Sequence, residues 1–438
     1  MVQYLRHIIT VLVLLAVVKA HADKVWIEDF VISAGETKTV ELLLDNKITY
    51  QSLQCDFELP EGLSIVKNSS NQPVFTATER TANHLIRGSQ PSGTGPNHYR
   101  VAMITFGNPI TGNSGAVATF QVVAADGFTG HHVIEMSNIR VGDEAQVSYK
   151  LEDYQCHVTT PITLAELVET GIEGVRYRLS DVLTGVYMPN GATIFAKDDN
   201  GFARQGEVPY VVAAGQTQYD NPNAFDQSNW IRINLPASTV TEYAGHEVSG
   251  IEGVLVNKLN PEIDVKEEPI VGDESPYEAN WYCPANFIEQ ADYFLMLPKP
   301  QEFARIRWAV YHEGAFYVPQ KTETNNTFDL CGAVKANFDA FYTGDPLIDG
   351  AVYELTAIIR AIDNTQPAPK NVMPKITDLS TQFEICPVTA ITNHIITSVE
   401  DLKTDGRQDG LYYNLLGQPV SHPSSGIYIH NGKKVIIK

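Results

Sequence analysis

Long apolar segments are scarce in this sequence, and no stretch after residue 22 is long enough to span a bilayer as a helix. Residues 23–150 also lack a sustained 3.6-residue periodicity, which argues against a helical first domain. Basic residues are few: 31 Lys and Arg stand against 52 Asp and Glu, and the net charge is −21. Because this charge repels phosphate backbones and anionic lipids, we expect no nucleic-acid partner and no direct adsorption to membranes.

Cysteine is rare as well. The five cysteines contain no C-x-x-C pair, which argues against a zinc ribbon and against a thioredoxin-type redox centre. Cys55 and Cys156 lie near the two ends of the predicted first domain. A disulfide between them would close a loop of about 100 residues and contribute roughly 4–5 kcal/mol in the chain-entropy model. Two small buried thiols are the alternative, and the sequence leaves both interpretations open.

Motifs of the common hydrolases are missing. His246 and His312 are each followed by Glu, as in H-E-x-x-H metalloproteases, but Gly250 and Phe316 stand where the second histidine is required. No G-x-S-x-G occurs either. We therefore predict no catalytic residue, no metal and no cofactor. Paired carboxylates of the glycosidase type leave no sequence motif, so a hydrolase remains the alternative.

The first 22 residues have the pattern of a secretory signal. Arg6 precedes an apolar run over residues 8–18, and Ala20 and Ala22 form a small-x-small cleavage site. The mature protein is therefore expected to begin at residue 23 and to be exported.

Residues 23–157 are predicted to be all-β. Val40, Leu42 and Leu44 alternate with polar neighbours, and the turn at Pro60-Glu61-Gly62 is typical of short connections between strands. Many short strands separated by Gly, Asn and Pro loops indicate a sandwich or jelly roll.

Three stretches of this segment carry a family resemblance. They are residues 35–37 (GET), 55–63 (CDFELPEGL) and 113–122 (NSGAVATFQV), completed by a late strand at residues 139–141. In these features the segment resembles a cohesin domain. The resemblance implies a β-sandwich that docks a partner protein, or, as in related sandwiches, polysaccharide. The chain contains no dockerin-like calcium repeat.

The middle of the chain is predicted to hold one or two OB-like β-barrels, over residues 165–270 and 271–387, after a short connecting helix at residues 161–170. Residues 231–235 (IRINL) resemble 334–338 (VKANF), and 254–256 (VLV) resemble 357–359 (AII). Both pairs are 103 residues apart, which indicates a tandem duplication.

Trp281 and Tyr282 are the candidate ligand-binding residues. They are predicted to lie in the loop between the two repeats, where aromatic rings can stack on sugar rings.

Residues 388–410 are a predicted linker, and residues 411–438 a small β-unit. Asn431-Gly432 between two strand-like runs is a strong hairpin signal, because both central residues of a type I′ turn need φ > 0. The unit resembles the C-terminal sorting domain of the type IX secretion system of Gram-negative bacteria. The residues that carry this resemblance include Gly417, Gly426, Asn431, Gly432, Lys433 and Lys434. It implies contact with the secretion machinery and delivery to the outer-membrane cell surface.

Together these observations predict a mainly β, non-catalytic, exported protein. It is expected to bind polysaccharide or another exported protein at the cell surface. A secreted glycoside hydrolase or other hydrolase and a structural surface component are the alternatives.

Overall fold

The computed structural model describes residues 23–105, 107–199, 202–203, 225–226, 228–236, 241–277, 279, 281–282, 299–320, 329–339, 341–362, 383–394, 412–413, 419–420, 426–430 and 433–437. Over these residues the elements are strands, one 3-10 turn (η1, Glu79–Thr81) and one short helix (α2, Leu164–Thr170). The prediction of a mainly β fold is confirmed. The chain divides into two compact units, Met1–Ile162 with Val175–Arg178, and Thr163–Gly174 with Leu179–Lys438.

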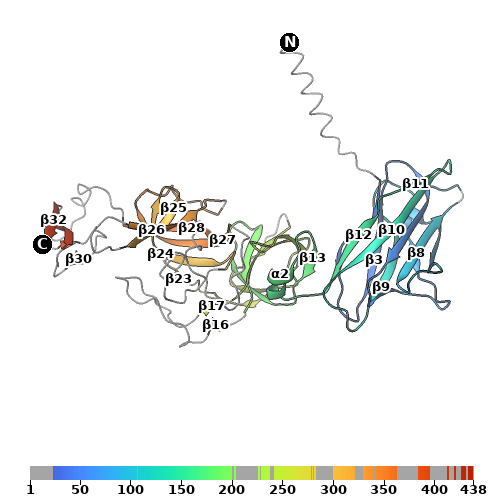
Figure 1. Cartoon of the computed structure of the whole chain (residues 1–438), viewed down its shortest axis with the longest axis horizontal. Helices are drawn as coiled ribbons and strands as arrows, with labels where there is room; N and C mark the ends of the chain where they lie inside the picture. Colours follow the sequence, from blue (N-terminus) through green and yellow to red (C-terminus); the bar gives the residue numbers. More distant parts are fainter. Residues whose placement is uncertain are drawn as a thin grey trace, which may run out of the picture. The chain divides into compact units, whose positions relative to one another are not determined.

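The first unit is a β-sandwich, the blue-to-teal part of Figure 1. One sheet has the order β1 (Lys24–Trp26), β3 (Thr37–Asp45), β9 (Ala116–Ala124), β5 (Leu63–Ile65), and β6 (Phe75–Ala77) also pairs with β9. The other has the order β2 (Phe30–Val31), β12 (Tyr154–Thr159), β10 (His131–Asp143), β4 (Tyr50–Glu58), β8 (His98–Ile104), β7 (Leu85–Ser89), and β11 (Ser148–Lys150) pairs with β10. The short β13 (Arg176–Arg178) also belongs to this unit.

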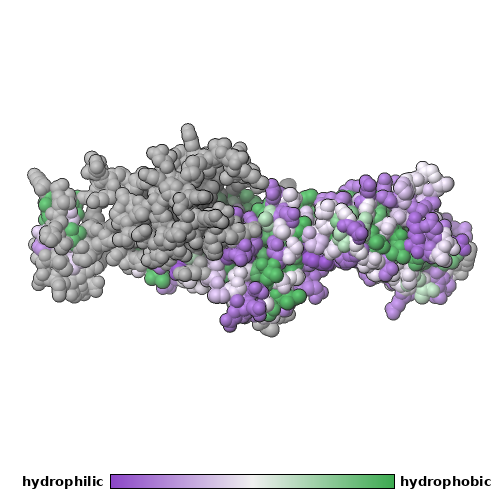
Figure 2. All heavy atoms as spheres, turned by 90° about the horizontal axis from the view of Figure 1, so that it is seen from below, coloured by the Kyte–Doolittle hydropathy of each residue, from purple (hydrophilic) through white to green (hydrophobic). Residues whose placement is uncertain are grey.

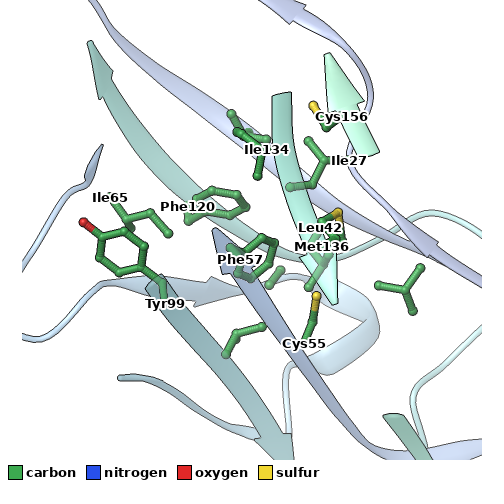
Figure 3. Packing of buried hydrophobic residues seen from close by; sticks show 14 of the residues in the cluster. Ile27, Leu42, Cys55, Phe57, Ile65, Tyr99, Phe120, Ile134, Met136 and Cys156 are labelled. Carbon is green, nitrogen blue, oxygen red and sulfur yellow. The ribbon is translucent and has the colours of Figure 1, made fainter. Parts of the chain in front are cut away.

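Alternate residues of both sheets form one core (Figure 3). Leu42 and Leu44 of β3 are fully buried, as their period-two spacing predicts, and they share the core with Leu53 and Phe57 of β4. Since strands of both sheets contribute to one continuous cluster, the predicted sandwich is confirmed. In Figure 2 the described surface of this unit is mainly hydrophilic, with smaller apolar areas between the polar side chains.

The disulfide suggested as one alternative for Cys55 and Cys156 is not formed: both residues are buried and both are free thiols. Strand β10 lies between β4 and β12, so the two residues are two strands apart. Two strand spacings are roughly 9–10 Å, whereas a disulfide needs Cα atoms within about 7 Å. Figure 3 shows the two sulfur atoms in different parts of the core. Burial raises the pKa of each thiol well above its usual value, which keeps both in the neutral form.

Alkylation of the unfolded, unreduced protein should therefore modify both Cys55 and Cys156 completely. Peptide mass spectrometry checks this result directly. Recovery of a peptide pair joined through these two residues would contradict it.

Helix α2 confirms the short helix predicted at residues 161–170. Thr163 caps it by accepting from the Glu166 backbone N–H, and the Glu166 carboxylate accepts in return from the Thr163 backbone N–H at 2.8 Å. Gly171 follows its last residue. Among the described residues, no helix has the length and apolar character needed to cross a membrane.

The second unit begins with a curled sheet. Its described strands follow the order β20 (Glu252–Asn257), β21 (Glu262–Val265), β18 (Trp230–Asn234), β15 (Thr193–Lys197), β14 (Leu183–Tyr187), β19 (His246–Ser249), β22 (Ile270–Glu274). The pair β16 (Phe202–Ala203) and β17 (Phe225–Asp226) stands apart from this sheet.

A closed barrel follows in the same unit. Its order is β24 (Phe303–His312), β25 (Ala315–Gln320), β26 (Asp329–Ala336), β28 (Phe383–His394), β27 (Val352–Ala361), and β24 pairs with β27 to close it. The pair of residues 281–282 forms β23, which adds to β24.

Strand pairing bears out the predicted repeat. Strands β15, β18, β21 and β20 pair antiparallel, parallel and antiparallel in turn, and β25, β26, β28 and β27 do the same. The parallel pairs match in register: Arg232 lies opposite Glu262, and Lys335, 103 residues later, lies opposite Glu384.

Side-chain contacts repeat along with the strands. Asn234 Nδ2 donates to Glu262 Oε1 at 2.7 Å, and Asn337 Nδ2 donates to Glu384 Oε1 at 2.8 Å. Because the second asparagine is also 103 residues after the first, the duplication extends to a polar bridge on the parallel pair.

The two repeats pack together through a small apolar cluster. It contains Phe195 of β15 and Phe341, Ile358, Cys386 and Val388 from the second repeat. The Phe195 and Phe341 rings meet edge to face with centroids 5.3 Å apart.

Near the C-terminus the chain forms a separate four-stranded sheet. Its order is β30 (Pro419–Val420), β29 (Tyr412–Tyr413), β31 (Gly426–His430), β32 (Lys433–Ile437). His430 pairs with Lys433, so residues 431–432 are the two-residue connection that the sequence predicts. Asn431 and Gly432 themselves lie outside the described residues.

Candidate docking face of the first unit

The outer face of the sheet β12-β10-β4-β8 is the candidate site. Along β4, Leu53, Cys55 and Phe57 point into the core, so the residues between them point outward. The outward residues of β4 are Ser52, Gln54, Asp56 and Glu58. The corresponding positions on β8 are His98, Arg100, Ala102 and Ile104, and those on β10 include Val133, Glu135 and Ser137.

An ion pair lies at the centre of this face. Arg100 donates two hydrogen bonds to Asp56, from Nε to Oδ1 at 2.5 Å and from Nη2 to Oδ2 at 2.6 Å. Asn138 Nδ2 adds a third, to Oδ2 at 3.2 Å, and His98 Nε2 lies 3.5 Å from the same oxygen. Burial raises the pKa of Asp56, but the bonds from Arg100 and Asn138 outweigh it and hold this pKa below its usual value.

A β-bulge supplies the third of these bonds. The register between β10 and β4 shifts between Ser137 and Arg140, and Asn138 has a φ of +51°. Asparagine tolerates this left-handed conformation, and the bulge turns its amide toward Asp56. The centre of the face is thus held rigidly by groups from three strands.

A cleft lies at one end of the face. Its volume is about 420 Å3, and it is lined by Glu58, Leu59, Pro60, Glu61, Gly95, Pro96, Asn97, His98, Val133 and Glu135. Glu58 on β4 and Glu135 on β10 are both exposed, and they are directly opposed in the strand register. Gln155 Nε2 donates to Glu135 Oε1 at 2.8 Å. Like charges in directly opposed positions destabilise a sheet, so this arrangement favours a bound positive group.

The other end of the face is apolar. Ile104 on β8 and Leu85 on β7 lie directly opposite each other, and they are 43% and 52% exposed. An acidic cleft, a fixed ion pair and an apolar pair therefore follow one another along the strands. Such a mixed, ordered surface suits recognition of another macromolecule.

The aromatic pair predicted as a ligand platform lies elsewhere. Trp281 and Tyr282 form strand β23, which pairs in parallel with β24 opposite Arg305 and Ile306. The prediction that they lie in a loop is wrong, because the segment adds as a strand to residues 305–306 of β24, beyond the pairing of β24 with β25 at residues 310–312. Their side chains lie outside what the structure describes.

Of the other residues predicted from the sequence, some lie within the described part of the chain and some do not. Gly426 lies in β31 and Lys433 and Lys434 in β32. Ala20, Ala22 and Gly417 lie outside the described residues.

Asp56, Glu58, Arg100 and Glu135 were not predicted as site residues. Their sequence signal is the appearance of charges at alternate positions of strands that are otherwise apolar. That signal cannot reveal which charges become neighbours, because the pairing of β4 with β8 and β10 is not local.

In the part of the chain that the structure describes, no three or more His, Cys, Asp or Glu residues gather into a group able to hold a metal ion.

Several solved structures are similar to part of this chain. The non-cellulosomal cohesin of Archaeoglobus fulgidus is 14% identical, covering 31% of this chain and 91% of its own, with a TM-score of 0.25. CaCohA2 of Clostridium acetobutylicum is 12% identical, covering 32% and 90%, with a TM-score of 0.26. A type II cohesin domain from the cellulosome of Acetivibrio cellulolyticus is 12% identical, covering 31% and 94%, with a TM-score of 0.25. Likeness at this level says nothing of activity or partner.

No protein-family model matches the sequence, and no curated protein matches it.

Proposed function

We propose that the chain is a non-catalytic binding protein that docks another exported protein on the outer face of β12-β10-β4-β8. The observation that carries the proposal is the acidic cleft at the end of a polar, rigidly held sheet face. The expected partner presents a lysine or arginine side chain to Glu58 and Glu135.

Charge supports a basic partner. The whole chain has a net charge of −21, so a basic surface is attracted over a long range before contact. At contact, a cationic group between Glu58 and Glu135 removes the unfavourable opposition of the two carboxylates.

The hydrolase alternative is weaker at this site. Glu58 and Glu135 are close enough to form a carboxylate pair, but both side chains are exposed. A general acid of a glycosidase needs an environment that raises its pKa, normally by burial away from water. Both glutamates are exposed to water instead.

Polysaccharide is the second candidate ligand, from the sequence interpretation of Trp281 and Tyr282 as sugar-stacking residues, although the two lie in strand β23 and not in a loop. A purely structural surface role is the third. Export through a signal at residues 1–22 and sorting by residues 411–438 belong to the proposal, as do OB-like domains at residues 165–270 and 271–387.

The test is binding of the mature protein to arrays of lysine- and arginine-rich peptides, acidic peptides and glycans, with a glycan hydrolysis assay. We expect basic peptides to bind. The double variant Glu58→Arg/Glu135→Arg should weaken that binding at least tenfold, or about 1.4 kcal/mol, because it reverses the charge of the cleft.

The matched control is Glu41→Arg/Glu267→Arg, which changes the net charge equally at two exposed positions off this face, one on β3 of the other sheet and one in the second unit. It should keep most of the affinity. If both variants lose the same amount of affinity for basic peptides, the effect is one of net charge alone, and the proposed docking face is wrong. Glycan binding without peptide binding would favour polysaccharide, and glycan cleavage would overturn the non-catalytic assignment.

A further inference from the structure

A pair of histidines joins β10 to β12 beside the cleft. His131 Nε2 lies 2.9 Å from His157 Nδ1, and the two rings are nearly parallel with centroids 5.1 Å apart. In the strand register His157 lies opposite Val133, one outward position from His131. Since Val133 lines the cleft, the pair and the cleft are neighbours on one face.

This geometry permits one added proton and opposes a second. When both rings are neutral, the N–H of one donates to the lone pair of the other. One added proton makes that bond charge-assisted and stronger. A second proton leaves two N–H groups facing each other without an acceptor, and two positive charges about 3 Å apart repel.

Acidic groups near the pair are few. Asp29 Oδ1 accepts from the backbone N–H of His157 at 2.8 Å, and it faces the pair from the segment before β2. The Glu28 carbonyl there accepts from the Cys156 thiol. Glu135, the next outward residue of β10 after Val133, is bonded to Gln155.

Positive and titratable groups also surround it. His132 lies on the opposite side of β10, where its ring bonds the Thr129 carbonyl at 2.8 Å and stacks on Phe128. Strand β13 contributes Arg176 and Arg178, and the Arg176 carbonyl accepts from the hydroxyl of Thr159, which lies opposite His131. Burial, then His157 and His132, lower the pKa of His131, and Asp29 offsets part of this.

We propose that His131 and His157 form a proton-sensitive latch between β10 and β12, closed while the pair carries at most one proton and opened by the second. Opening loosens β12, the strand that carries His157, from the centre of its sheet. It also places positive charge beside the acidic cleft, so docking of a basic partner weakens in acid. This last consequence rests on the proposed function, whereas the latch itself does not.

The direction of the pH effect follows from the lowered pKa. In the unfolded chain both histidines titrate near 6.5. Between that value and the lowered folded value, the unfolded chain binds more protons than the folded one. The contribution of the pair to the stability of the first unit therefore falls as the pH drops below about 6.5, where the unfolded chain binds two protons and the folded pair holds one.

Two measurements on the mature protein test the latch. NMR of the histidine ring carbons should show the pair titrating in two separated steps rather than as two independent groups. The melting temperature of the first unit should fall between pH 7.5 and pH 5 by about 3 °C more in the wild type than in His157→Gln. Glutamine keeps a hydrogen-bond acceptor for His131 but takes no proton.

His132→Gln is the matched control, because it removes a neighbouring histidine from the other side of the same strand. It should keep the acid sensitivity of the wild type. Equal pH profiles for the wild type and His157→Gln, or two independent titrations near 6.5, would overturn the latch.

Docking is followed separately with a basic peptide at pH 7.5 and pH 5. If the peptide binds at neither pH, the proposed docking face is wrong, and the latch is then judged by the melting temperatures and the NMR titration alone. Binding that weakens in acid for the wild type and for His132→Gln, but less for His157→Gln, supports both.

Discussion

Replacing Phe57 by alanine should lower the free energy of unfolding of the first unit by about 3–5 kcal/mol. The ring is fully buried between the two sheets, beside Phe120 (Figure 3). Its centroid lies 5.5 Å from that of Phe120 and 5.9 Å from that of Phe75. Truncation removes apolar burial and leaves a cavity lined by rigid rings, which cannot collapse fully. Calorimetry should show the corresponding transition lowered by roughly 10 °C.

The reciprocal variant Phe316→Ala tests whether the two units unfold separately. Phe316 is fully buried in the barrel of the second unit, so its loss should lower the other transition and leave the first in place. Coincident shifts in both variants would contradict the division into two units. A loss below 1 kcal/mol for Phe57→Ala would contradict the packing described for the core.

Replacing Asn260 by alanine should destabilise the second unit by about 2–5 kcal/mol. Its side chain bonds both backbone polar groups of Ala361: Nδ2 donates to the Ala361 carbonyl at 2.9 Å, and Oδ1 accepts from the Ala361 N–H at 2.8 Å. Both bonds are buried, so alanine leaves a donor and an acceptor without partners and without water. Chemical denaturation followed by fluorescence measures the loss.

The same residue joins the two repeats, because Asn260 lies between β20 and β21 and Ala361 ends β27. Gln301 strengthens the junction by donating to the Asn260 carbonyl at 3.3 Å. Asn190→Ala is the matched control: Asn190 is exposed, and its side chain accepts from the Ala192 N–H within its own turn, so its loss should cost less than 1 kcal/mol. If the two variants lose equal stability, Asn260 does not hold the repeats together.

Local features of the sequence predicted local structure well. The Asn431-Gly432 signal predicts a two-residue connection, and the register of β31 and β32 has it. The 103-residue offset predicts equivalent strands, and the opposed pairs Arg232–Glu262 and Lys335–Glu384 occupy equivalent positions. Turn chemistry and repeated segments are visible along the chain itself, which is why these predictions succeed.

Non-local pairing accounts for the failures. Cys55 and Cys156 stand near the two ends of one domain, but the intervening strand β10 keeps them apart as free thiols. The loop expected at Trp281 and Tyr282 is a strand because β24 accepts it as a neighbour. The order of strands in a sheet cannot be read from the composition of any single strand.

By itself, the sequence determined the β class, the sandwich, the short helix after it and the repeat, because side-chain alternation, capping and duplication are properties of neighbouring or copied residues. Only the tertiary structure decided which charges meet. Asp56 with Arg100, Glu58 with Glu135 and His131 with His157 are brought together by strand pairings across 44, 77 and 26 residues, and the physical cause is the register of each antiparallel pair.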